Sequence, residues 1–257
     1  MMMEERESLF QYLLLLGDNS MILGQRLAEL CGHGPELETD IALTNISLDL
    51  FGQVRNYFQH AAEIIGDGRT EDDIAMLRYE HEYKNALLVE QPNTDFAYVI
   101  ARQFFYDVYH QLLLTQLKKS ADMQIAAIAE KSIKEVNYHV DFSSAWVNRL
   151  GDGTEESHKR MQEAVNYLWP YALGLLQETP VEKQMKEVGI GADLSLISKK
   201  YKEKIADVLN DASLTLPEAE FIQNGGKNGT HSEHMGFILA DFQFMQRTYT
   251  NMNWSRK

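Results

Sequence analysis

Proline is scarce and widely spaced in this chain, so long stretches remain free to be helical. Between the prolines, apolar residues recur three and four positions apart, the spacing that puts side chains on one face of an α-helix. No alternating apolar and polar run flanked by turn residues predicts a strand. The sequence therefore predicts an all-α protein. The five prolines are Pro35, Pro92, Pro170, Pro180 and Pro217.

Four long helices are expected over residues 5–30, 38–65, 94–117 and 121–150. A helix of that length is roughly 40 Å long, and short connections between such helices predict a helical bundle. A shorter helix is expected over 70–85, with Thr70 as its N-cap. Glycine-rich turns are expected to end several of these segments, as at Gly66. Further helices are expected over 154–177, 181–188, 193–209 and after Ser232.

Two details of the long helices can be compared directly with a structure. Gly17-Asp18-Asn19 interrupts the first helical run and is expected to bend it. In the second helix the apolar residues are expected to face inward. They are Ile41, Leu43, Ile46, Leu48, Leu50, Phe51, Val54, Phe58, Ala61 and Ile65.

Charge and cysteine content restrict the class of protein. The chain has 24 Lys and Arg against 38 Asp and Glu, a net charge of −14. Its only basic clusters are short, at 118–119, 199–204 and 256–257, so a nucleic-acid partner is not expected. The one cysteine, Cys31, cannot form an internal disulfide, which favours a reducing compartment. Without a signal peptide or membrane span in its sequence, the chain is expected to be cytoplasmic.

A helical bundle with acidic and histidine residues raises the question of a carboxylate-bridged di-iron site. The ferritin-like template needs a carboxylate from each of two helices and Glu-x-x-His from each of two others. The matches here are imperfect, and capping, paired polar groups or a contact between chains explain them better. The candidate pairs are Glu155 with His158, Asp107 with His110, Glu135 with His139, and His231 with His234 beside Glu233.

Several peptides, in order along nearly the whole chain, carry a resemblance to a known family. They include Leu16-Gly17-Asp18-Asn19, Cys31-Gly32-His33-Gly34-Pro35, Leu88-Val89-Glu90-Gln91-Pro92-Asn93 and Gly226-Lys227-Asn228-Gly229. With these peptides the chain resembles the C-type subunits of the bacterial phenylacetyl-CoA epoxidases, which act in phenylacetate degradation.

The resemblance implies a single ferritin-like helical domain over 1–257, a four-helix bundle with additional C-terminal helices. It implies a structural, non-catalytic protein that pairs with a homologous catalytic subunit of the A type, within a complex of several different subunits. That complex epoxidises the ring of phenylacetyl-CoA with dioxygen. Its di-iron centre is held in the catalytic subunit, and its electrons come from a flavin and iron–sulfur reductase. No cofactor is expected in this chain, and the isolated chain is expected to pair with itself.

The resemblance also places the six metal-ligand positions of the catalytic subunit on this chain. Only two keep a ligating side chain, Asp107 and His139. Two ligands do not hold two irons, so the metal centre is expected to be lost. Asp107 is expected to meet His139, Arg55 or Arg102 as a structural remnant. The four lost positions are Met21, Leu50, Gln53 and Val136, and a register shift of one residue lets Asp49 replace one ligand at most.

The resemblance implies acyl-CoA contacts on two segments, where lysines and amides suit phosphates and pantetheine amides. These segments are Glu82-Tyr83-Lys84-Asn85 and Lys183-Gln184-Met185. Ordinary surface lysines are an equally good interpretation of them. Which aromatic acyl-CoA is used, and the stoichiometry of the complex, stay open.

Two other functions remain as alternatives. One is a self-sufficient di-iron carboxylate protein, either an oxygenase or a ferroxidase. Val136 and Met21, in place of metal ligands, disfavour it. The other is a free-standing acyl-CoA-binding module. The di-iron alternative would use Glu38, Asp107, His110, Glu135, His139 and Glu233.

Overall fold

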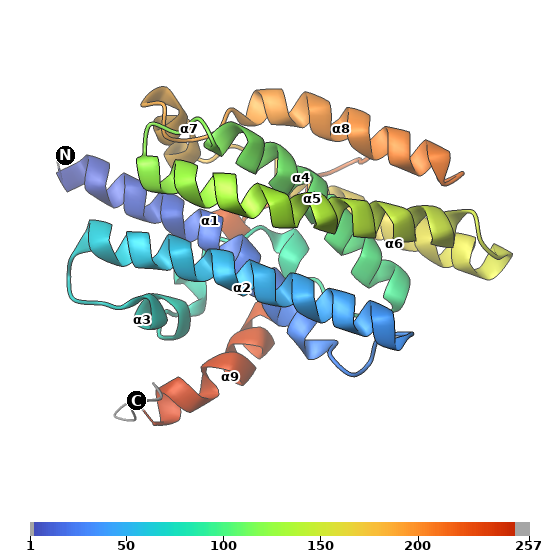
Figure 1. The fold of residues 1–257 in the computed structure, drawn as a ribbon, viewed down its shortest axis with the longest axis horizontal. Helices are drawn as coiled ribbons and strands as arrows, with labels where there is room; N and C mark the ends of the chain where they lie inside the picture. The colour runs from blue at the N-terminus through green and yellow to red at the C-terminus, as the bar shows by residue number, and fades with distance from the viewer. Residues whose placement is uncertain (1–2, 250–257) are drawn as a thin grey trace.

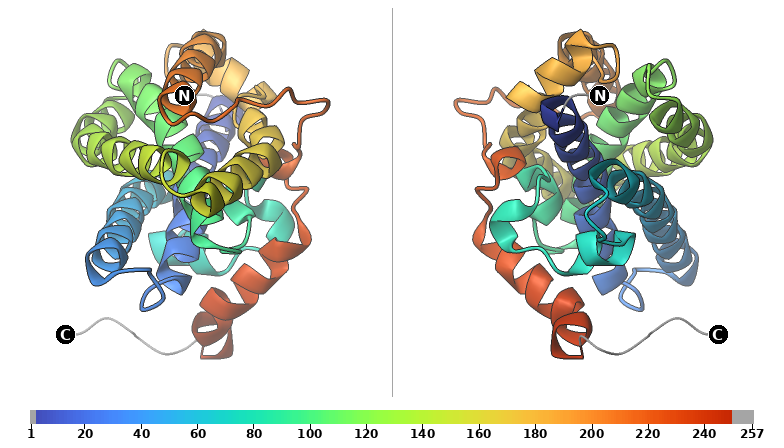
Figure 2. Two further views of the ribbon diagram at one scale, coloured as in Figure 1. Left: turned by 90° about the vertical axis from the view of Figure 1, so that its right-hand side faces the viewer. Right: turned by 90° about the vertical axis from the view of Figure 1, so that its left-hand side faces the viewer.

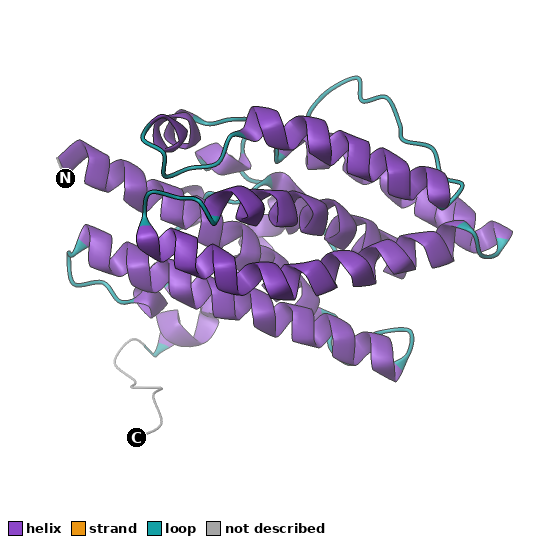
Figure 3. Cartoon of the chain, turned by 45° about the horizontal axis from the view of Figure 1, so that its top comes forward, coloured by secondary structure: helices purple, strands orange, loops and turns teal. Residues whose placement is uncertain are grey.

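The computed structural model describes residues 3–249, and every regular element in that range is a helix (Figure 3). The bundle consists of α1 (Met3–Glu29), α2 (Leu37–Ile65), α4 (Phe96–Leu117) and α5 (Met123–Gly151). Helix α1 packs along α2, α4 packs along α5, and α2 also contacts α5 (Figure 1). The predicted all-α, ferritin-like four-helix bundle is therefore confirmed.

The remaining elements cover this bundle. Helices α6 (Glu155–Gly174) and α8 (Leu194–Asp211) pack against α4 and α5, and α7 (Pro180–Glu187) packs against α1. Helix α9 (Glu233–Thr248) contacts α1 and α3 (Glu71–Met76), and it lies on the side of the bundle opposite α8 (Figures 1 and 2). In the described part of the chain, three short 3₁₀ helices complete the set: η1 (Glu80–Glu82), η2 (Leu87–Glu90) and η3 (Gly226–Asn228). Among residues 3–249, no helix combines the length and apolar character needed to cross a bilayer.

Local chemistry sets several helix ends where the sequence predicts them. The Thr70 hydroxyl accepts a hydrogen bond from the backbone N–H of Asp73 at 3.2 Å, and the Asp73 carboxylate accepts one from the N–H of Thr70. This reciprocal pair satisfies two backbone donors at the start of α3. At the end of α2, Gly66 adopts the left-handed conformation with φ of 59° and donates its N–H to Ala62. The N-cap at Thr70 and the glycine end at Gly66 are confirmed.

The expected helix over 70–85 is too long, because α3 ends at Met76. The Arg78 side chain folds back so that its Nε donates to the carbonyl of Ile74 at 2.6 Å and its Nη1 to Asp18 at 2.9 Å. The backbone N–H of Lys84 then donates to the same carboxylate at 2.8 Å. These contacts with α1 hold the chain after Met76 out of the helical path, so tertiary contacts override local propensity.

The expected interruption of α1 is absent, since the helix runs unbroken through Gly17-Asp18-Asn19. A Cβ on Gly17 would lie 2.3 Å from Cε1 of Phe58, which shows that glycine here allows α1 and α2 to approach closely. The Asn19 amide donates to the carbonyl of Leu15 at 3.0 Å, within the helix. The polar pair is thus accommodated by hydrogen bonds and the glycine by packing, and neither breaks the helix.

Two residues of α2 that were expected to face inward are on the surface. Ile41 is 50% exposed and Leu48 is 62% exposed. The buried stripe of α2 includes Leu43, Ile46 and Leu50. Two positions along a helix correspond to a rotation of about 200°. Ile41 and Leu48, two positions before Leu43 and Leu50, therefore point away from the core.

Candidate functional site

The six positions at which the resemblance expects metal ligands all lie in the interior of the bundle. They come from α1, α2, α4 and α5, as the template requires. Three of them are hydrocarbon or thioether side chains, which offer no hard donor to iron. All six are buried: Met21, Leu50, Gln53, Asp107, Val136 and His139.

Asp107 is fully buried and has neutral hydrogen-bond partners. Its Oδ1 accepts from Nε2 of Gln103 at 2.7 Å, and its Oδ2 accepts from Oγ of Ser143 at 2.8 Å. Burial raises the pKa of the Asp107 carboxyl to about 7, although these two hydrogen bonds and the nearby His139 oppose that rise. A carboxyl in this setting is readily protonated near neutral pH.

The expected hydrogen bond from Asp107 to His139, Arg55 or Arg102 is wrong. Arg102 donates instead to the carbonyl of Gln91 and to Oδ1 of Asn93. Arg55 is exposed and lies 3.9 Å from Glu71. The His139 imidazole is hydrogen-bonded to a different carboxylate, that of Asp49. The buried acid therefore has two neutral donors where a cation was expected.

A ladder of polar pairs joins α2 to α5 at the surface edge of this core. Nε2 of His139 lies 3.0 Å from Oδ2 of Asp49, and Nε2 of Gln53 donates to Oε2 of Glu135 at 3.2 Å. Each helix contributes residues four apart, which share a helix face. The Glu135 carboxylate is thus bonded to the Gln53 amide, and the Asp49 carboxylate to the His139 imidazole. Both carboxylates of the ladder therefore already have a hydrogen-bond partner.

The donor set does not fit a di-iron centre. Across the described range, no group of three or more histidine, cysteine, aspartate or glutamate side chains converges so as to hold a metal ion. Of the six residues considered as an alternative ligand set, Glu38 lies at the start of α2 and Glu233 at the start of α9, far along the chain from the core positions. His110 is buried in the core, and burial lowers its pKa to about 3, so it stays neutral.

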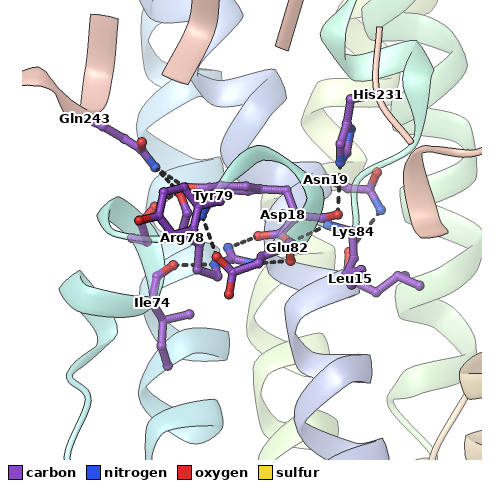
Figure 4. Close-up of polar contacts among 12 residues, drawn as sticks. Leu15, Asp18, Asn19, Ile74, Arg78, Tyr79, Glu82, Lys84, His231 and Gln243 are labelled. Carbon is purple, nitrogen blue, oxygen red and sulfur yellow. Dashed lines mark hydrogen bonds and ion pairs between the residues drawn. The ribbon is translucent and has the colours of Figure 1, made fainter. Parts of the chain in front are cut away.

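A second polar region lies under the segment 78–93, where Asp18, from one of the peptides that carry the resemblance, contacts Arg78 and Lys84 (Figure 4). The buried Asp18 carboxylate accepts from both terminal nitrogens of Arg78 and from the N–H of Lys84. Oδ1 of Asn19 accepts from the N–H of Ala86 at 2.8 Å. Two consecutive polar residues of α1 therefore hold this segment against the bundle.

Glu90 anchors the other end of the segment to the start of α9. Its side chain accepts from Nδ1 of His231 at 2.6 Å, from Nδ2 of Asn85 at 2.8 Å, and from the N–H and hydroxyl of Ser232 at 2.9 and 2.6 Å. Nε2 of His231 lies 3.0 Å from the carbonyl of Tyr83. Both ring nitrogens face acceptors, which favours the protonated imidazole and raises the pKa of His231 above its ordinary value. The helix start predicted around His231 and His234 is confirmed, since Ser232 is the N-cap of α9, and the His231 side chain is in addition part of a buried ion pair.

The four residues of the first candidate acyl-CoA segment differ in their environment. Tyr83 is buried, and Cζ of Arg78 lies 4.1 Å from the centroid of the Tyr83 ring. Asn85 is buried and hydrogen-bonded to Glu90. The Glu82 carboxylate accepts a hydrogen bond from the backbone N–H of Tyr79 at 2.6 Å. Lys84 is partly exposed and its ammonium is free to contact a ligand. The segment is therefore mainly scaffold that presents one lysine.

The second candidate segment lies on α7. Met185 is in the core, Gln184 accepts from Ser8 at 2.8 Å, and Lys183 is exposed. The structure brings the start of α7 and Lys84 to one pocket of about 230 Å³. Lys84 lines this pocket together with Gln11, Leu15, Thr179, Pro180, Val181, Lys227 and Asn228.

Sequence reasoning missed the buried ion pairs that support this pocket. Nζ of Lys227 lies 2.8 Å from Oε1 of Glu182 and also donates to the carbonyls of Leu175 and Gln177. Arg78 with Asp18 is a second such pair. The only signal in the sequence is an acidic residue inside an apolar helical run, which predicts that a partner exists and not which residue it is.

Comparison with known proteins agrees with the resemblance. The sequence model of a family described as phenylacetic acid catabolic protein matches residues 1–254. A curated relative, the C-type subunit of the 1,2-phenylacetyl-CoA epoxidase of Escherichia coli (strain K12), is 45% identical over 243 residues. The match covers 95% of this chain and 98% of the relative.

Proposed function

The chain belongs to the phenylacetic acid catabolic protein family, and from this membership we propose that it is the non-catalytic subunit of a phenylacetyl-CoA epoxidase. In this role it supports a homologous di-iron catalytic subunit. It also helps to shape the site for the CoA ester. The iron and the oxygen chemistry belong to the catalytic subunit, whereas electrons come from a separate reductase.

The chemistry of the bundle core carries this proposal. At three of the six ligand positions the side chains are Met21, Leu50 and Val136, all buried and unable to neutralise iron. The remaining acid, Asp107, is satisfied by two neutral donors. Di-iron sites need several anionic oxygens around the metal pair. In this bundle, apolar side chains that pack the core stand at three of the positions where such oxygens would be needed, which suits a supporting subunit.

The test is purification of the chain with and without the homologous catalytic subunit, under anaerobic conditions with ferrous iron. We expect the two to co-purify, with iron in the catalytic chain and less than one iron per copy of this chain. Epoxidation of phenylacetyl-CoA should require both. Two irons per chain in this protein alone, or turnover without the partner, would show a self-sufficient di-iron enzyme instead.

For the acyl-CoA ester, we propose that Lys84, which lines the pocket beside α7, contacts the CoA portion there, and that Lys183, exposed on α7 outside the lining of this pocket, contacts it as well. Both ammoniums are accessible, and lysine is a suitable point charge for phosphate. Lys84→Gln and Lys183→Gln should raise the KM of the assembled complex for the CoA ester and leave kcat nearly unchanged. Lys159→Gln on α6, at a lysine that is exposed like Lys183, is the control. An unchanged KM in both variants would remove these contacts from the proposal while leaving the supporting role intact.

A further inference from the structure

Two basic clusters that lie about 80 residues apart in the sequence meet at one cleft. Lys119 follows the end of α4, and Lys200 lies on α8. Both line a cleft of about 440 Å³ between these elements and the loop 189–191. The volume is within the range of small-molecule sites in proteins. This cleft is separate from the pocket beside Lys84, with which it shares no lining residue.

The charges in the cleft are not balanced by the protein. Among residues 3–249, neither the Lys119 nor the Lys200 ammonium lies within ion-pair distance of a carboxylate, whereas Lys118 pairs with Glu130 at 3.0 Å. The acidic residue of the adjoining loop, Asp193, pairs with Lys186 at 3.0 Å. Two lysines without an ion-pair partner among residues 3–249 therefore line one cleft, in a chain whose net charge is −14.

Helix electrostatics account for only one of these lysines. A cation near the C-terminus of α4 is favourable, which suffices for Lys119. Lys200 is in the middle of α8, which spans Leu194–Asp211, where no helix end requires a cation. Its position at the cleft is therefore not explained by stability of its own helix.

The walls of the cleft are held in place by hydrogen bonds. The Gln116 side chain donates to the carbonyl of Asp193 at 3.2 Å and accepts from its N–H at 2.8 Å. The Ser120 hydroxyl donates to the carbonyl of Ile190 at 2.8 Å. These bonds tie the end of α4 to the loop before α8, so the cleft is formed before any ligand arrives. The apolar part of its lining consists of Leu112, Leu196 and Ile197.

We propose that this cleft binds a phosphorylated small molecule, with the phosphate held by Lys119 and Lys200 and an apolar portion against the leucine and isoleucine side chains. Lysine ammoniums bind phosphate as point charges, and each such charge-assisted hydrogen bond is stronger than a neutral one. A concave site with two lysines and apolar side chains in its lining suits an organic phosphate better than a flat acidic protein surface.

The experiment uses phenyl phosphate and inorganic phosphate as probes, with binding to the full chain followed by ligand-detected NMR. We expect saturable binding of one phenyl phosphate per chain, tighter than that of inorganic phosphate because the ring adds apolar contact. Lys119→Gln/Lys200→Gln should weaken binding by roughly tenfold or more. Lys199→Gln/Lys202→Gln makes the same change of charge on α8, outside the cleft, and should change it less than about twofold.

Three results would overturn the proposal. The first is the absence of saturable phenyl phosphate binding. The second is equal weakening in both double variants, which would indicate general electrostatic attraction. The third is binding of an acidic polypeptide through these lysines in the absence of phenyl phosphate binding. All four substituted lysines are exposed, so thermal unfolding should show that each variant keeps the fold.

Discussion

Asp107 shows how burial changes the protonation of a single acidic side chain. The carboxyl is fully buried, and its two donors, Gln103 and Ser143, are neutral. Burial disfavours the charged form, which is why its pKa rises to about 7 from an ordinary value of 3.8. Between these two values the folded protein binds a proton that the unfolded chain releases, so this group lowers stability as pH rises.

We therefore expect Asp107→Asn to stabilise the protein at pH 8 by on the order of 2 kcal/mol, and by less as pH falls toward 4. The new amide keeps an acceptor for Gln103 and can donate to Ser143, whose hydroxyl already lies 2.9 Å from the carbonyl of His139. Urea unfolding of both proteins across this pH range is the measurement. Lower stability of the variant at pH 8 would contradict the expected cost of the buried charge.

His231 provides a pH dependence with a different origin. Burial by itself lowers the pKa of His231, but the hydrogen bond and charge of Glu90 outweigh this and hold that pKa above its ordinary value of 6.5. A raised pKa means that the stabilisation is complete below about pH 6.5 and is lost as pH rises through the folded-state pKa.

We expect His231→Gln to be less stable than the parent protein at pH 6 by about 1–3 kcal/mol, because a buried hydrogen bond to a charged group is lost. The difference should narrow as pH rises, since the parent then loses its own charge. His33→Gln, at an exposed histidine, is the control and should show no such trend. A difference that is constant with pH would mean that the imidazole is neutral in the fold.

At the scale of elements, the contact between α1 and α2 depends on a glycine. A Cβ on Gly17 would overlap the ring of Phe58, whereas a Cβ on Gly52 of α2 would have nothing within 4 Å. Both glycines are inside helices, where alanine is intrinsically preferred. The two sites therefore separate helix propensity from helix–helix packing.

Gly17→Ala should destabilise the protein by roughly 1–3 kcal/mol through overpacking, despite the better helix propensity of alanine. Gly52→Ala should stabilise it by about 0.5–1 kcal/mol. Thermal unfolding compares the two. The cost of Gly17→Ala should shrink in a Phe58→Leu background, and equal gains at both glycines would rule out a packing role for Gly17.

The segment 78–93 is an element with little regular structure that polar contacts nevertheless hold in place. Asp18 and Arg78 are both buried, and each would be left as an unpaired charge without the other. Removing one member of such a pair generally costs several kcal/mol, because the remaining charge is desolvated. Asp18 and Glu90, which lie in two of the peptides that carry the resemblance, therefore hold this segment in place, and Lys84 is its partly exposed lysine.

At the scale of the molecule, the outer side of α2 exposes an apolar row. Leu37, Ile41 and Leu48 are 70%, 50% and 62% exposed. Exposed apolar residues in a row on a helix are typical of protein–protein contact surfaces. This surface is consistent with a chain that pairs with a homologous partner and, when isolated, with itself.

We expect the isolated chain to self-associate in a concentration-dependent manner, as measured by analytical ultracentrifugation. Leu48→Glu should weaken this association by roughly tenfold, since a carboxylate would be desolvated at the contact. Leu196→Glu, at a leucine of similar exposure on α8, should leave it unchanged. A chain that is monomeric at all concentrations would contradict self-association. Equal effects of both variants would show that the outer side of α2 is not the contact surface.

The existence and approximate limits of most helices follow from the sequence alone. Apolar periodicity, Thr70 as a cap and Gly66 as an end are local signals, because they depend on residues within a few positions of each other. That Leu50 and Val136 cannot bind iron is equally readable, since no fold converts a hydrocarbon side chain into a metal ligand.

Only the tertiary structure decided which polar groups are partners. Arg78 is paired with Asp18, which lies 60 residues away in the sequence, and His231 is paired with Glu90, which lies 141 residues away. The early end of α3 and the unbroken path of α1 follow from those contacts and from close packing. The energy of such pairs depends on desolvation and geometry, which exist only once distant segments are assembled. Local chemistry thus determined the helices, and burial between them determined what each charged side chain does.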